Sequence, residues 1–149
     1  MNLLRYAGVY LLISLLIPVV LWMIEESTGS SVAGSGLWVV PILGAAMIEG
    51  QYFVRTAGAA PTKGESWRFA RRGTGIVLLV STGFVLVYGL LVDPEVLEIA
   101  QSLLSDTTGL IIIACVLALV LLLTLPLNRF FFWMGARNEM KMIEKRAKS

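Results

Sequence analysis

Four long apolar stretches, separated by short polar segments, dominate the hydrophobic pattern of this chain. They cover residues 6–24, 37–54, 73–92 and 108–132. A helix of about 19 residues is about 28 Å long, which is close to the thickness of the hydrocarbon core of a bilayer. The pattern therefore predicts an all-α integral membrane protein, a four-helix bundle that forms a single membrane domain over residues 1–149.

The segment between the second and third stretches carries the signal of a helix start. Thr62 and Glu65 have the S/T-x-x-E spacing of a capping box, in which each side chain accepts from the other residue's backbone N–H. This predicts a helix from residue 63 along the membrane surface through Trp67. The helix either continues into the third span or bends near residues 73–75.

Two further helices are predicted outside the spans. Residues 95–105 alternate apolar and polar positions at helical spacing, which is typical of a short amphipathic helix in the outer loop between spans three and four. This segment is too short to cross a bilayer. Residues 135–149 form a basic tail, for which we expect a frayed helix on the cytoplasmic surface.

Composition agrees with the membrane class. Hydrophobic residues make up 57% of the chain and charged residues only 15%, whereas soluble domains have about 45–50% and about 25%. Three tryptophans, Trp38, Trp67 and Trp133, lie near the ends of the apolar stretches, and we expect them to anchor the helices at the membrane interface.

The charges are sorted along the chain. All 12 Lys and Arg residues lie in the N-terminal segment, in the loop between spans two and three, or from Arg129 onward. The other two loops carry only acidic charges. The positive-inside rule then predicts that both termini of this multi-pass protein lie in the cytoplasm.

Glu49 is the only acidic residue within the four apolar stretches. Small residues beside it, Ala45, Ala46 and Gly50, predict a closely packed helix face that points Glu49 into the bundle. Glu49, Gln51, Tyr52 and Arg129 are the candidate functional polar site. Three interpretations stay open for Glu49: a structural ion pair or hydrogen bond, a proton or cation site, and a contact with another membrane protein. The structural interpretation predicts one of four partners: Arg129, Tyr10, Asn128 or Arg55.

No motif indicates catalysis. The chain has no histidine and a single cysteine, so it lacks the commonest general base and the commonest metal ligands. It has no nucleophile motif and no phosphate-binding loop. We therefore expect a protein that is not an enzyme, with no catalytic, cofactor-binding or metal-binding residues and no cofactor.

One stretch resembles a known group of sequences. The run Glu49-Gly50-Gln51-Tyr52-Phe53 and the following Gly58-x-x-Pro61-Thr62-x-x-Glu65-x-Trp67 are similar to an uncharacterised family of small four-span bacterial inner-membrane proteins. The similarity covers about a fifth of the chain closely. It implies the four-span architecture and the inner membrane, and it brings no activity.

The sequence thus favours a non-catalytic binding protein of the inner membrane. Two forms fit: an immunity-type protein that neutralises a membrane-acting bacterial toxin, or an accessory subunit of a membrane complex. The alternative is a small ion- or proton-coupled transporter or channel that uses Glu49. Expected partners are membrane lipids and another protein, with homo-oligomerisation left open and no nucleic acid.

Overall fold

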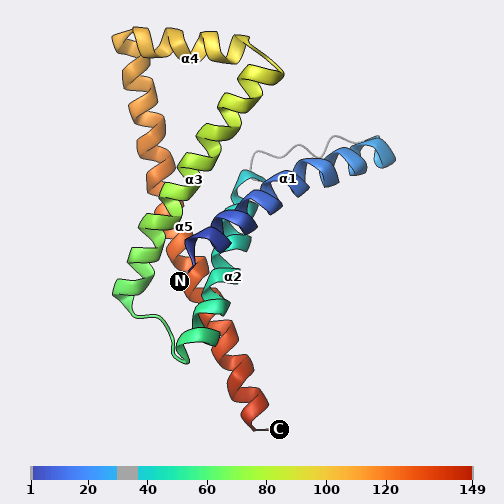
Figure 1. Cartoon of the computed structure of the whole chain (residues 1–149), viewed down its shortest axis with the longest axis vertical. Helices are drawn as coiled ribbons and strands as arrows, with labels where there is room; N and C mark the ends of the chain where they lie inside the picture. Colours follow the sequence, from blue (N-terminus) through green and yellow to red (C-terminus); the bar gives the residue numbers. More distant parts are fainter. Residues whose placement is uncertain (1, 30–36, 149) are drawn as a thin grey trace.

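The computed structural model describes residues 2–29 and 37–148, and within them every regular element is a helix (Figure 1). The elements are α1 (Leu3–Thr28), a short 3-10 helix η1 (Leu37–Val39), α2 (Val40–Ala57), α3 (Lys63–Leu91), α4 (Glu95–Ser105) and α5 (Thr107–Ala147). The all-α class is therefore confirmed. The side chain of Trp38, one of the expected interface anchors, lies outside the described part of the chain.

Three helices, α1, α3 and α5, are long and apolar enough to cross a membrane. They correspond to the first, third and fourth expected spans. The second expected span, α2, is not among these candidates, because Glu49, Gln51 and Arg55 interrupt its 18 residues. The structure thus supports a membrane protein with three clear candidate spans.

Local signals set the ends of these helices. The capping box is present: Thr62 N–H donates to Glu65 Oε2 at 2.8 Å, and Glu65 N–H donates to Thr62 Oγ1 at 3.3 Å. From there α3 continues without a break to Leu91, so the predicted surface helix and the third span are one element. Gly58 ends α2 at φ 68°, a left-handed conformation that glycine adopts without steric cost.

The basic tail is part of α5. We expected a frayed helix after the fourth apolar stretch; the tail is helical, and α5 extends unbroken over 41 residues from Thr107 to Ala147. Packing explains the difference: Gly135, Ala136 and Glu139 are buried, and a β-carbon added at Gly135 would collide with the backbone of Met47 in α2. The helix is therefore held by α2 well beyond the last apolar turn.

The core lies at the end of the molecule where α2 crosses α5. A β-carbon added at Gly50 would collide with the carbonyl oxygen of Phe132, which means that the two backbones touch there. Close approach through glycine is a common way for membrane helices to associate. Aromatic rings fill the adjoining space, with Phe69 of α3 stacked on Phe132 at 4.2 Å between centroids and Tyr6 of α1 edge-on to Phe69 at 5.3 Å.

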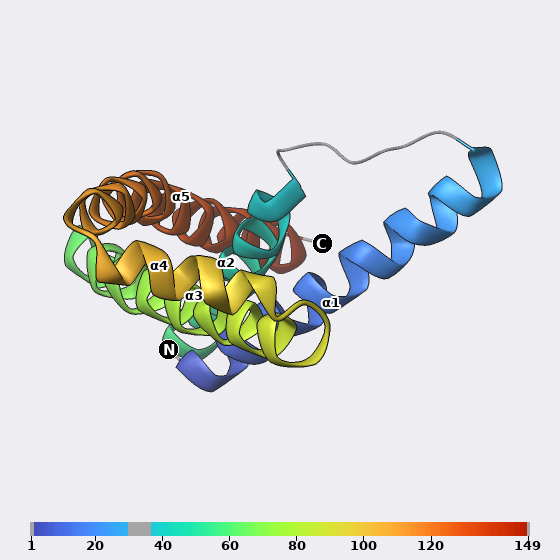
Figure 2. The same cartoon turned by 90° about the horizontal axis from the view of Figure 1, so that it is seen from above.

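Beyond this core the long helices diverge. In Figure 1 α3 and α5 run upward to the two ends of α4, which lies across them, while α1 leads away to the right; Figure 2 shows from above that α1 is separate from α3, α4 and α5 along most of its length. The corners are closely packed, because Gly89 faces Leu97 and Gly109 faces Leu103. The expected amphipathic helix between spans three and four is confirmed as α4, and none of its residues is buried.

Candidate functional site

Glu49 lies in the packed core, on the small-residue face of α2. Its side chain is only 1% exposed, and Ala45, Ala46 and Gly50 beside it are also buried. The prediction that this face points Glu49 into the bundle is confirmed. A carboxylate in such a place is costly unless charge and hydrogen bonds compensate it.

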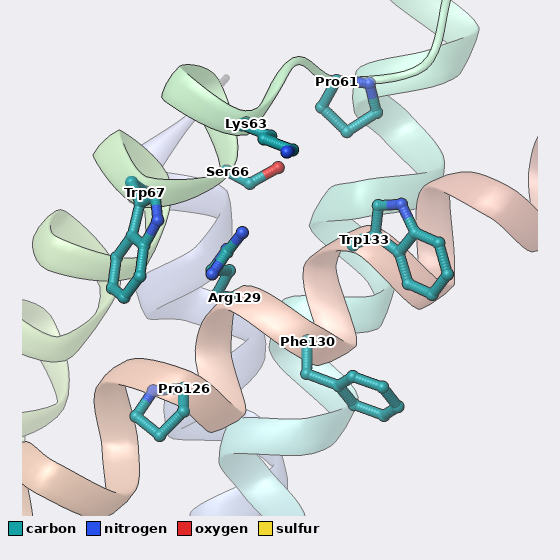
Figure 3. Close-up of a pocket in the computed structure, with 8 residues that line it drawn as sticks. All are labelled: Pro61, Lys63, Ser66, Trp67, Pro126, Arg129, Phe130 and Trp133. Carbon is teal, nitrogen blue, oxygen red and sulfur yellow. The ribbon is translucent and has the colours of Figure 1, made fainter.

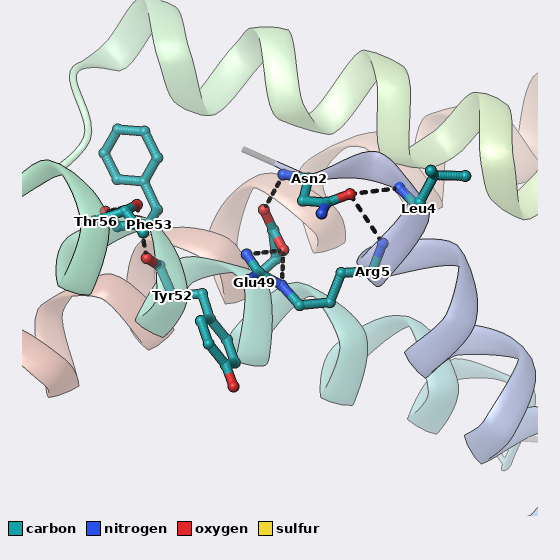
Figure 4. A network of polar contacts seen from close by, with 7 residues as sticks. All are labelled: Asn2, Leu4, Arg5, Glu49, Tyr52, Phe53 and Thr56. Atoms are coloured by element: carbon teal, nitrogen blue, oxygen red, sulfur yellow. Dashed lines mark hydrogen bonds and ion pairs between the residues drawn. The ribbon is translucent and has the colours of Figure 1, made fainter.

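The first turn of α1 supplies the compensation (Figure 4). The backbone N–H of Asn2 donates to Glu49 Oε1 at 2.7 Å. Arg5 donates to Oε2 from Nε at 2.9 Å, and its Nη2 lies 2.7 Å from the same oxygen. Both carboxylate oxygens are therefore engaged. The pair joins residues 44 positions apart and fixes the start of α1 against α2.

Arg5 is itself held in place. The side chain of Asn2 accepts from the backbone N–H groups of Leu4 and Arg5, which caps α1 and sets the direction of its first turn. The guanidinium of Arg5 lies 3.9 Å from the centroid of the Tyr52 ring, one turn along α2 from Glu49. A cation over an aromatic face at this distance contributes about 0.5–1 kcal/mol at a partly exposed site.

The four partners predicted for Glu49 were wrong. Each has another neighbour: Arg55 pairs with Glu139, Arg129 lies over Trp67, Asn128 bonds to Tyr6 and Thr74, and Tyr10 lies beside Ser81. The reason is the length of α1. Because it begins at Leu3 rather than near residue 6, its first turn reaches the level of Glu49.

A second ion pair holds the tail of α5 on α2. Arg55 Nε donates to Glu139 Oε1 at 2.8 Å, and Nη2 donates to Oε2 at 3.2 Å, so the contact is bidentate. The hydrogen bonds from Arg55 are the main reason that the pKa of Glu139 lies below its ordinary value. The guanidinium of Arg55 also lies 5.5 Å from the centroid of the Tyr52 ring, so Tyr52 is a neighbour of both Arg5 and Arg55.

A buried hydrogen-bond chain crosses the core between three helices. Tyr6 Oη donates to Asn128 Oδ1 at 2.7 Å, and Asn128 Nδ2 donates to Thr74 Oγ1 at 3.2 Å. All three side chains are at most 1% exposed. Every buried side-chain nitrogen and oxygen in the described residues has a partner. These hydrogen bonds therefore join α1, α3 and α5, and no buried nitrogen or oxygen of the three side chains lacks a partner.

Arg129 belongs to a different part of the molecule. Its guanidinium lies 4.5 Å from the centroid of Trp67, across the junction of α3 and α5. There it lines a pocket of about 440 Å³ together with Pro61, Lys63, Ser66, Trp67, Pro126, Phe130 and Trp133 (Figure 3). The expected interface anchors Trp67 and Trp133 are both 42% exposed at this pocket.

The predicted polar site is thus divided. Glu49 and Tyr52 share a neighbour in Arg5, Gln51 is half-buried on α2, and Arg129 lines the pocket on α3 and α5. Sequence reasoning missed Arg5 as the partner of Glu49. One signal in the sequence could have identified this pair. Arg5 is the only basic residue before the first span, and Glu49 is the only acidic residue within the spans.

No metal centre is evident in the described residues. Within 2–29 and 37–148, no three acidic, cysteine or histidine side chains lie close enough together to hold a metal ion. Cys115 is exposed on α5.

Comparison of the chain with protein-family models, curated proteins and solved structures finds no match. The resemblance to small four-span inner-membrane proteins stays a prediction.

Proposed function

We propose that this protein is a non-catalytic binding protein of the bacterial inner membrane that holds a membrane-inserted segment of another protein. The observation that carries the proposal is the uneven packing of its apolar helices. In α1 the buried residues are Tyr6 and Tyr10, and none of the described residues from Leu11 to the end of the helix is buried.

The middle parts of the other two long helices, α3 and α5, also contain no buried residue. Between Val77 and Gly89 of α3, and between Gly109 and Thr124 of α5, every residue is exposed or only partly buried. Lipid can cover such surfaces. However, helices of membrane proteins gain most of their association from packing against each other, and here the packing is concentrated at the basic end and at the corners with α4. The diverging outer halves offer apolar surface along which a partner helix can lie (Figure 1).

In the topology that we propose, α2 crosses the membrane as well as α1, α3 and α5. The chain then crosses four times, and both termini lie in the cytoplasm. The turn between α2 and α3 and the end of α5 lie at the opposite end of the molecule from α4 (Figure 1). Basic residues lie on both sides of this turn, at Arg55 and Lys63, and along the end of α5, whereas α4 carries Glu95 and Glu98. This separation supports the positive-inside orientation.

The acidic outer end favours a partner with basic residues outside the membrane, because opposite charges raise the rate of encounter. A basic toxin that enters the inner membrane from outside would meet this requirement, and so would a basic outer segment of a larger membrane complex. We favour the immunity-type role, with the accessory-subunit role as its close variant.

Ion-coupled transport through Glu49 has weaker support. Both oxygens of its carboxylate are engaged, and the side chain is 1% exposed. A site that exchanges protons or cations needs access for the ion at some stage. The geometry of Glu49, Arg5 and Asn2 instead suits a fixed structural pair.

The experiment combines protection and cross-linking. Cells that express the product of the neighbouring gene, with and without this protein, are compared for survival. A photo-cross-linking residue is placed at Leu16 in the outer half of α1 and, as a control of equal exposure, at Met142 in the basic tail; both are 50% exposed. We expect protection, and cross-links to the toxic product from position 16 but not from position 142. Equal cross-linking at both positions, or no protection, would contradict the proposal.

A further inference from the structure

The pocket between α3 and α5 has one polar and one apolar end. Figure 3 shows the side chains of Lys63 and Arg129 converging from the two helices, with the hydroxyl of Ser66 between them. Pro126 and Phe130 lie at the other end, on the turns of α5 that lead back into the apolar part of the helix. The pocket therefore has the polarity of a phospholipid near its head group.

The charge at the polar end is not compensated by protein. Among the described residues that line the pocket, none is acidic. Neither Lys63 nor Arg129 takes part in an ion pair within the described ranges, where the pairs found are Arg5–Glu49 and Arg55–Glu139. The nearest acid in sequence, Glu65, uses its carboxylate to cap α3 at Thr62.

Arg129 is held in position without being neutralised. Arg129 is half-buried and rests on the face of Trp67, which fixes the guanidinium while its N–H groups remain available. Ser66 donates its hydroxyl hydrogen to the carbonyl oxygen of Thr62 at 3.0 Å, which leaves the lone pairs of Ser66 Oγ at the pocket rather than a donor. Recognition of an anion here therefore depends on Lys63 and Arg129.

The position along the membrane also fits. Trp67 and Trp133 flank the polar end, and tryptophan is enriched at the level of lipid head groups. Basic pockets between transmembrane helices on the cytoplasmic side are a recognised way of binding anionic head groups. A volume of about 440 Å³ suits a head group with the first part of its chains, while the rest lies along the exposed apolar surface of α5.

We propose that this pocket binds the phosphate of an anionic phospholipid, with Lys63 and Arg129 as the phosphate ligands and Pro126 and Phe130 against the start of the acyl chains. Arg129, which the sequence suggested as part of the Glu49 site, is thereby assigned to lipid binding. This inference depends on membrane insertion alone and does not depend on the partner protein proposed above.

The test titrates phosphatidylglycerol and, separately, phosphatidylcholine into the full-length protein in a neutral detergent, with bound lipid counted by native mass spectrometry. The test variant is Lys63→Gln/Arg129→Gln. The matched control, Arg72→Gln/Lys141→Gln, removes the same charge from two exposed residues that do not line the pocket. Circular dichroism shows whether each variant keeps its helices.

We expect the wild type to prefer phosphatidylglycerol. A basic residue near an anionic lipid surface contributes about fivefold in affinity, so the test variant, which lacks two of them, loses about 25-fold and the preference with it. The control keeps the preference. A charge-conserving variant, Lys63→Arg/Arg129→Lys, keeps most of it, which separates charge from a general disturbance of the fold.

Two results would overturn the assignment. The first is an equal loss in the test and control variants, which would mean that net charge alone attracts the lipid. The second is that inorganic phosphate at millimolar excess displaces the lipid completely and stabilises the protein as well as the lipid does. The site would then recognise free phosphate, and the proposed contact with acyl chains would be wrong.

Discussion

Removal of Arg5 should destabilise the protein more than removal of the charge on Glu49. In Arg5→Met the carboxylate of Glu49, which is 1% exposed in the native protein, keeps only the N–H of Asn2, because the contacts from Nε and Nη2 are lost. Breaking a buried ion pair in this way costs about 3–5 kcal/mol. Since the side chain of Arg5 is 28% exposed, we expect the lower end, about 3 kcal/mol of unfolding free energy.

The reverse change is milder for a physical reason. In Glu49→Gln the amide oxygen still accepts from Asn2, and Arg5, which is partly exposed, keeps its contact with the Tyr52 ring. The expected loss is about 1 kcal/mol. The double variant should lose little more than Glu49→Gln alone, because the uncompensated carboxylate is gone. This gives a coupling of about 3 kcal/mol between the two positions.

The assay is reversible unfolding in mixed detergent micelles, followed by circular dichroism, for both single variants and the double variant. Arg71→Met is the control, since Arg71 is an exposed cation in α3. If the two effects simply add, or if Arg5→Met loses no more than Arg71→Met, the pair does not hold α1 to α2. The structural interpretation of Glu49 would then have to be abandoned.

Three further changes test the core and the tail. Gly50→Ala should lower stability by several kcal/mol, since the added methyl group meets the backbone of α5, whereas Gly75→Ala, with open space around it, should raise helix stability by about 0.5–1 kcal/mol; a loss at both would argue against the glycine contact. Asn128→Ala should lower the free energy of unfolding by about 2 kcal/mol in the same assay, because the buried hydroxyl groups of Tyr6 and Thr74 lose their partner. An unchanged stability would mean that these three side chains are not buried as described. Because the pKa of Glu139 is lowered in the folded state, its contribution to stability is present above the unfolded-state value of about 4.5 and is lost as the pH falls through the folded-state value. Glu139→Gln should therefore flatten the loss of stability below about pH 4.5, and an unchanged acid limb in a pH-dependent melt would contradict the role of Arg55.

Much of the architecture follows from local sequence signals. The helices lie where the apolar stretches predict them, the capping box at Thr62 and Glu65 starts α3, and the small residues of α2 turn Glu49 inward. Each of these signals acts within about one or two helical turns. Local chemistry is sufficient to specify such features without knowledge of the neighbouring helices.

The partners of the polar side chains were not predictable in the same way. The contact between Arg5 and Glu49 depends on how far α1 extends before its first apolar turn and on the crossing of α1 and α2. The pocket depends on the meeting of Lys63 and Arg129 across two helices. The divergence of the outer halves has no local signal in the sequence. Apolar residues at these positions have the same composition whether they face lipid, another helix or a partner protein.

The orientation of the chain in the membrane decides which of its surfaces a partner from outside the cell can reach. In a Cys115→Ala background, single cysteines are introduced at Ala59, in the turn between α2 and α3, and at Ser102 in α4; both positions are exposed. Spheroplasts are then treated with a maleimide that does not cross the membrane. We predict labelling at position 102 in intact spheroplasts, and at position 59 only after permeabilisation. Labelling of position 59 from outside, or of both positions alike, would contradict a membrane protein with its basic ends in the cytoplasm and α4 on the outer surface.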